Sequence, residues 1–299
     1  VSDRHTTNRL GNTMDPKSLV NNLDHLVSLP DVCIKVNQLL GTGDYSAPEV
    51  ADIVIQDTDI SARILRLVNS PAFGQRSKIE TLSRAVTLMG ADELRNLVLA
   101  TAAQSTFVGI PEEMVNMADF WSHSVTTGVM AKILAERCNV LHSERLLVMG
   151  VLHDIGRLVI YLSLPNESRD ILHITGGDNW ILPQTEQEIL GFTHLDVGAE
   201  LMRSWQLPES FIEVAGYHNA PENAVENPIE VSLIHIAKAV ANGHMVGLSV
   251  DEMLWAIAPT AWETTGLSAE TVASLVEEMV AKSEETMGLI LAPAKRMQA

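Results

Sequence analysis

The two residues of this sequence whose types are best suited to catalysis or metal binding are His153 and Asp154. They are adjacent and lie inside an apolar run over about 146–162. Burying an imidazole and a carboxylate is costly unless each gains a partner. The sequence leaves two kinds of partner open. One is a metal ion, and the other is the set of polar side chains and backbone groups around the pair. A metal partner would indicate an enzyme, whereas polar protein partners would indicate a chain that keeps an enzyme's fold without its chemistry.

Further histidines fall on the inward faces of expected helices. His123 shares a helical face with Met130, and His218 lies four residues after Val214 on the same apolar side. His194 stands at a helix N-terminus, where its side chain can lean into an adjoining cavity. Together with the His153-Asp154 pair, four helices would each offer a ligand.

Such a set of donors has a defined chemistry. Imidazole nitrogens with a carboxylate suit Fe, Mn, Ni or Zn better than Ca or Mg. An aspartate can bridge two metals, and a bridged site lowers the pKa of a bound water and aims it at a phosphorus atom. A single histidine on an apolar face is more often a hydrogen-bonded core residue, and spacing between helices is not diagnostic. The pattern alone leaves a metal site and a polar core equally open.

Composition limits the classes of function. The chain has 299 residues, 46% of them apolar and only 4% aromatic, which favours helix over sheet. No apolar run approaches the roughly 20 residues that span a bilayer, and the first residues lack an apolar signal core, so we expect a cytoplasmic protein. The net charge of −18 and the missing Lys/Arg stripe argue against nucleic acid and anionic membranes as partners.

Helix boundaries can be expected from capping residues. Ser46 and Glu49 form a capping box that opens a helix running to Val68, and Thr193 and Asp196 form another. Expected helices also cover about 82–89, 120–137, 208–220 and 229–241, the stretch around 153–154, and a last helix from Ser268. Residues 163–183 contain two glycines in a row and two prolines, which predicts a linking segment with limited helix.

These elements predict an all-α protein, a multi-helix bundle with an N-terminal helical subdomain. Residues 1–14 would be a tail, 15–112 the N-terminal subdomain, 113–285 the helical core and 286–299 the C-terminal end. The boundary is placed at Gly109-Ile-Pro111, because the chemistry-bearing histidines all follow it.

Several segments resemble one family. The set His123, His153-Asp154, His194 and His218 resembles the HD superfamily of metal-dependent phosphohydrolases, and "QDTDISARILRLVNSPAFG", "GVLHDIGRL" and "HLDVGAELMRSWQLP" resemble its HDOD branch, the HD-related output domain. The resemblance implies an all-helical bacterial signalling module that works with response regulators or cyclic-dinucleotide enzymes.

The resemblance also implies a ligand set, namely His123, His153, Asp154, His194 and His218, holding one or two transition-metal ions. Two residues depart from the pattern. Lys238 stands where the superfamily closes its site with an aspartate, and its charge would repel a metal. Asn219 replaces a second consecutive histidine. Lys238 could pair with Asp154 or hold a substrate phosphate, and His235, one turn earlier, is a less favoured replacement ligand.

Two functions remain open. The first is a signalling module that acts through protein partners, with a retained but incomplete metal site or no metal at all. The second is a metal-dependent phosphohydrolase acting on a nucleotide or phosphoester, in which Asp154 orients the attacking water and Lys238 clamps the phosphate.

Overall fold

The structure, a computed structural model, describes residues 15–23, 30–70, 73, 78–107 and 109–290. Within these residues every regular element is a helix, which confirms the predicted all-α class. The tail expected at 1–14 lies outside the described residues. The expected C-terminal end is partly helical, because the last helix continues to Ile290, and only 291–299 lie outside the described residues.

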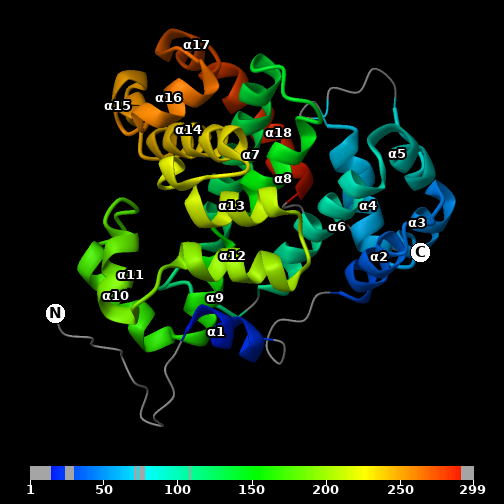
Figure 1. The fold of residues 1–299 in the computed structure, drawn as a ribbon, viewed down its shortest axis with the longest axis horizontal. Helices are drawn as coiled ribbons and strands as arrows, with labels where there is room; N and C mark the ends of the chain where they lie inside the picture. Colours follow the sequence, from blue (N-terminus) through cyan, green and yellow to red (C-terminus); the bar gives the residue numbers. More distant parts are fainter. Residues whose placement is uncertain (1–14, 24–29, 71–72, 74–77, 108, 291–299) are drawn as a thin grey trace.

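Five helices form a group at one side of the molecule (Figure 1). They are α2 (Asp31–Gly41), α3 (Ala47–Val54), α4 (Thr58–Val68), α5 (Leu82–Met89) and α6 (Ala91–Thr106). This group corresponds to most of the expected N-terminal subdomain. The first helix, α1 (Pro16–Leu23), is not part of this group. It buries Leu19 and Val20 and packs on α9 (Ile155–Ser163) and α12 (His194–Ser204).

The remaining helices form a second group, in which α7 (Met117–Arg137) packs against α8 (Glu144–Leu152), α14 (Pro228–Met245) and α18 (Val276–Ile290) (Figure 1). The others are α10 (Pro165–Thr175), α11 (Leu182–Leu190), α13 (Glu209–Tyr217), the short 3-10 helix η2 (Pro221–Asn223), α15 (Val250–Trp255), α16 (Pro259–Thr265) and α17 (Ala269–Ser274). Residues of α7 that would face solvent in a peripheral helix are buried here.

Three expectations about the helices are wrong: two expected helices are each divided in two, and one expected linker contains a helix. The helix expected over 46–68 is divided into α3 and α4, because the Asp57 carboxylate accepts a hydrogen bond from the Ile60 amide at 3.0 Å and caps a new helix. The last helix is likewise divided near Leu275. Residues 163–183 hold the complete helix α10, whose first turn contains Pro165 and whose left-handed cap is Gly176. The proline and the glycine therefore mark the two ends of a helix, and this segment is not the linker that was expected.

The His153-Asp154 pair is also placed differently from the expectation. It lies in the turn between α8 and α9, not inside a helix. The expectation that no apolar run approaches membrane-spanning length is wrong for Glu144–Ser163. By length and composition alone, this stretch is long and apolar enough to cross a membrane. Of the residues in its apolar 18-residue window, 83% are buried inside the protein, as in the core helices of a globular fold.

The close contact of α9 with α12 depends on Gly156. A Cβ at this position would lie 2.1 Å from the His194 carbonyl oxygen and 2.6 Å from the Gly198 amide nitrogen. We therefore expect Gly156→Ala to push the two helices apart and to lower the free energy of unfolding by about 3 kcal/mol or more. Gly216→Ala is the matched control, because its Cβ would meet Ala199 at an ordinary 3.6 Å. Urea unfolding of the two variants measures this, and equal losses would contradict the account.

A second prediction concerns the contact between α6 and α8. Burial and the nearby Glu144 raise the pKa of Glu93 to about 7, and Arg145, which pairs with Glu230, opposes the rise. The folded state therefore keeps this proton above the pKa of the unfolded chain. Stability falls as the pH rises from about 4.5 to 7, by about 3 kcal/mol in total. We expect Glu93→Gln to remove that loss in urea titrations at pH 5 and pH 8. If the free energy of unfolding of Glu93→Gln fell between pH 5 and pH 8 by as much as that of the wild type, Glu93 would not be the source of the loss.

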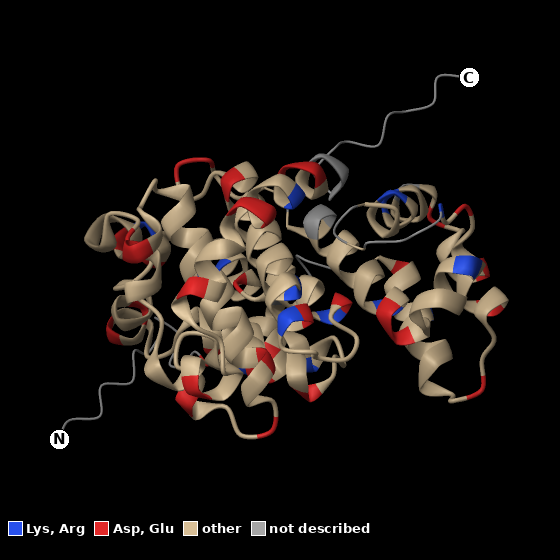
Figure 2. Cartoon of the chain, turned by 90° about the horizontal axis from the view of Figure 1, so that it is seen from above, with Lys and Arg blue, Asp and Glu red and all other residues tan. Residues whose placement is uncertain are grey.

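The surface charge is strongly acidic. The sequence has 38 acidic and 20 basic residues, and Figure 2 shows Asp and Glu on many of the described helices in this view, with fewer Lys and Arg.

Candidate metal centre

His153 and Asp154 face inward from the turn between α8 and α9, and both are buried. The His153 Nδ1 atom lies 2.6 Å from the Gly150 carbonyl oxygen. A carbonyl can only accept, so Nδ1 carries the proton and Nε2 keeps its lone pair. That Nε2 atom has no hydrogen-bond partner and lies 3.5 Å from the Asp154 Oδ2 atom.

His194 enters from the first turn of α12, as the Thr193–Asp196 capping box predicts. Its Nδ1 atom lies 2.6 Å from the Glu186 Oε2 atom of α11, and the same oxygen accepts from the His194 backbone amide at 2.8 Å. The free Nε2 atom points toward the Asp154 Oδ1 atom at 3.6 Å. Glu186 thus orients the imidazole as carboxylates commonly orient metal-binding histidines, a role that the sequence did not reveal.

His218 and Lys238 meet at the same Asp154 oxygen, Oδ1, that His194 approaches. The His218 Nδ1 atom donates to the Val214 carbonyl at 2.8 Å, so its Nε2 atom is an acceptor. The Lys238 ammonium lies 2.9 Å from that Nε2 atom, 3.1 Å from Asp154 Oδ1 and 3.1 Å from Asn219 Oδ1. These three acceptors use all three N–H donors of the ammonium group.

His123 approaches from α7 with neither ring nitrogen bonded. Its ring centre lies 5.4 Å from that of His153. Arg157, one turn along α9, places its Nη1 atom 3.5 Å from Asp154 Oδ2 and binds the Tyr161 hydroxyl at 3.2 and 3.3 Å. All five predicted ligand residues therefore come together in space.

His235 takes no part in this cluster. Its Nδ1 atom donates to the His218 carbonyl at 2.8 Å, and its Nε2 atom accepts from the Ala258 amide at 2.9 Å. Both ring nitrogens are used, so His235 is not available as the replacement ligand considered from the sequence.

The protonation of the cluster follows from burial and local charge. Burial lowers the pKa of His153 to about 3 and that of His218 to about 4, and it takes the pKa of His123 well below its usual range. Burial alone would raise the pKa of Asp154, but His153 and Lys238 bring it well below its ordinary value. His123, His153 and His218 are therefore neutral and Asp154 is ionised, which are the forms that bind metals. At His194 burial opposes the charged form, but Glu186 and Asp154 raise the pKa of this imidazole above its ordinary value.

The donors can be tested for fit to metal ions. Ligand atoms of His123, His153 and Asp154 all lie within 4.8 Å of one another, and so do those of Asp154, His194 and His218. The unbonded nitrogens of His123 and His153 are buried polar atoms without a partner, which suits a metal in the first group. In the second group, the Lys238 ammonium already contacts two of the three ligands.

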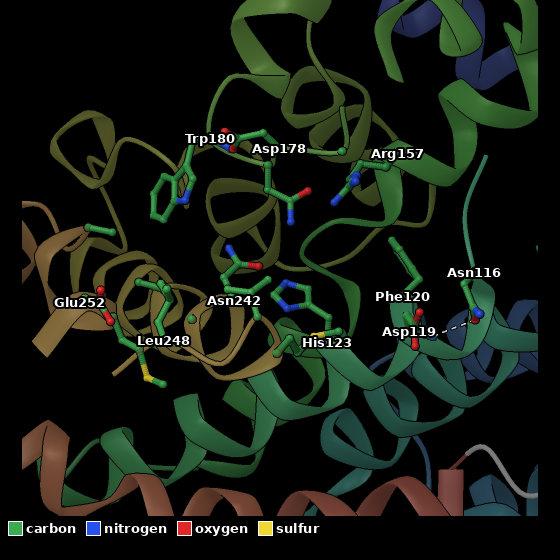
Figure 3. Close-up of a pocket in the computed structure, with 18 of the residues that line it drawn as sticks. Asn116, Asp119, Phe120, His123, Arg157, Asp178, Trp180, Asn242, Leu248 and Glu252 are labelled. Carbon is green, nitrogen blue, oxygen red and sulfur yellow. Dashed lines mark hydrogen bonds between the residues drawn. The ribbon is translucent and has the colours of Figure 1, made fainter. Parts of the chain in front are cut away.

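Two adjoining cavities open onto the cluster. The larger, about 500 Å³, is lined by His123, Arg157, Trp180 and Asn242 among others (Figure 3). The smaller, about 290 Å³, reaches Lys238 and Asn219 and shares Trp180 and Asn242 with the first. Trp180 stands in the connection between α10 and α11, and nothing in its sequence context predicted that it would lie at this site.

Solved structures with the same fold come from several bacteria. A provisionally named phosphohydrolase of Shewanella amazonensis has a TM-score of 0.72 and 24% identity, with 91% of this chain and 98% of that chain covered. An HDOD domain protein of unknown function from Geobacter sulfurreducens has a TM-score of 0.70 and 23% identity, covering 93% and 99%. At these identities the likeness shows the fold alone.

Sequence comparison gives the family. An uncharacterized protein of Treponema pallidum is 24% identical over 214 residues, which cover 70% of this chain and 40% of that protein. The chain thus spans about two fifths of that relative's length. The family model of the HDOD domain matches residues 26–221, well over half of the chain. On that match, the chain belongs to the HDOD family.

Proposed function

We propose that this chain is a bacterial signalling module that acts in the cytoplasm by binding protein partners, and that its HD-type metal site is incomplete. The partners we expect are response regulators or cyclic-dinucleotide enzymes. The observation that carries the proposal is the Lys238 ammonium, which has three acceptors at 2.9–3.1 Å. A cation held in this way repels a divalent ion beside it.

The group of ligands that Lys238 does not obstruct would take at most one ion. His123, His153 and Asp154 would hold it, and the donor types favour Fe, Mn, Ni or Zn. His194 and His218 would then be structural neighbours of Asp154 and not ligands of a second ion. We assign Asp154 the role of joining the two halves of the cluster.

A second candidate, a metal-dependent phosphohydrolase acting on a nucleotide or phosphoester, is favoured by one observation. The larger cavity reaches His123 and Arg157, so a substrate of moderate size could approach the cluster. In that case Asp154 would orient the water. Lys238 is poorly placed as a phosphate clamp, because its three donors already have acceptors.

Metal analysis followed by a turnover screen separates the two. The protein is purified without chelator or a metal-carrying tag, and less than about a tenth of a metal per chain excludes the phosphohydrolase. If metal is present, phosphodiesters and nucleotides are tested with the wild type and with Asp154→Ala. We expect equal background rates. Metal-dependent hydrolysis that is lost in Asp154→Ala would overturn the signalling proposal.

A further inference from the structure

The mouth of the larger cavity carries side chains that the metal centre does not use. On one side Trp180 is 59% exposed, and on the other Val246 is 72% exposed, with Met245 and Leu248 beside it. Figure 3 shows Trp180 and Leu248 on opposite sides of the hollow. We call Trp180, Met245, Val246 and Leu248 the apolar rim. Exposed apolar side chains gathered around a hollow mark a place where another molecule binds.

The same mouth is acidic. Asp119, Asp178 and Glu252 line it, on three different elements (Figure 3). Among the described lining residues the one Lys or Arg is Arg157, and its guanidinium contacts Asp154 and Tyr161. The rim therefore presents negative charge next to apolar surface, and an occupant with positive charge is favoured.

The apolar surface is larger than the cavity. Trp255, at the end of α15, is 94% exposed and lies three residues after Glu252, so the two are neighbours on one helix face. A small molecule inside the hollow would leave the outer edge of the rim and Trp255 in water. A protein segment laid across the mouth would cover both.

We propose that the apolar rim and its three carboxylates form a docking groove for a protein segment that carries both apolar and Lys or Arg side chains. Its apolar side chains fill the mouth between Trp180 and Leu248, and its cations pair with Asp119, Asp178 and Glu252. An amphipathic helix laid in an apolar groove is a common mode of peptide recognition. The inference rests on the proposed function only in taking the partner to be a protein.

The probe is a labelled amphipathic peptide of leucine and lysine, with a leucine–glutamate peptide for comparison, followed by fluorescence anisotropy against the full chain. Val246→Ser is compared with Val225→Ser, since both valines are highly exposed and Val225 is remote from the groove. Glu252→Gln is compared with Glu49→Gln, because each glutamate completes a capping box that glutamine can also complete.

We expect the leucine–lysine peptide to bind, Val246→Ser to weaken it about fivefold and Glu252→Gln to weaken it roughly twofold at low salt, with both controls unchanged. Leu248→Ser serves as a second rim variant if Val246→Ser does not fold. No binding, equal binding of the acidic peptide, or equal weakening by the controls overturns the groove. So does a wild-type dimer that Val246→Ser dissociates, because the rim would then be a self-interface. Each of these results concerns only peptide binding or self-association. The proposed function is overturned by a different result, metal-dependent hydrolysis, so the two failures can be told apart.

Discussion

Replacing Lys238 with aspartate is expected to add one tightly bound divalent metal ion per chain. The change removes the ammonium that contacts Asp154 and His218 and places a carboxylate near the same ligands. Asp154, His194, His218 and the new carboxylate would then offer nitrogen and oxygen donors of the kind that transition metals bind. Without metal, two buried carboxylates face each other, so the apo variant should lose about 3–5 kcal/mol of stability.

Equilibrium dialysis against Mn²⁺ or Zn²⁺ with elemental analysis measures this prediction. The expected result is one more ion per chain in Lys238→Asp than in the wild type, together with a larger metal-induced rise in Tm. Lys282→Asp makes the same charge change at the ion pair with Glu278, away from the cluster, and should leave the metal content unchanged. Equal content in folded Lys238→Asp and wild type would show that the lysine does not block a second ion.

The second large effect is the coupling between Asp154 and Lys238. Asp154→Ala leaves a buried ammonium without its anion, and Lys238→Met leaves a buried carboxylate with Arg157 as its remaining cation at 3.5 Å. Each single change should cost about 3–5 kcal/mol, and the double change should cost clearly less than their sum. Urea unfolding of the four proteins gives the coupling free energy.

The matched comparison is Glu278 and Lys282, a partly exposed pair one helical turn apart on α18. Its coupling should be about 0.3–0.5 kcal/mol. Additive losses at Asp154 and Lys238 would mean that the ammonium is not held by that carboxylate.

Local capping chemistry made much of the fold predictable. Both Ser46–Glu49 and Thr193–Asp196 form the capping boxes that the sequence predicts, and the helix expected over about 82–89 is α5, which ends at Gly90. Interruptions inside apolar runs were not predictable in the same way. The turn at His153-Asp154 keeps the apolar pattern of α8 and α9 on both sides, so periodicity alone does not reveal it.

The candidate site was predictable residue by residue but not as a set of contacts. Lys238 and Asn219 were two unrelated departures in the sequence, yet the structure joins them by a 3.1 Å hydrogen bond. Glu186, which binds His194, and Trp180, which lines both cavities, carry no local signal of their roles. Each becomes visible only when α11 and the loop before it pack beside α12 and α14, and this depends on tertiary packing.

The most direct test of the central claim is a crystal structure of the wild type grown with Mn²⁺, with anomalous scattering used to locate the ions. We expect one peak at most, between His123, His153 and Asp154, with the Lys238 ammonium still within hydrogen-bond distance of Asp154 and His218. A second peak among Asp154, His194 and His218, with Lys238 turned away, would contradict it.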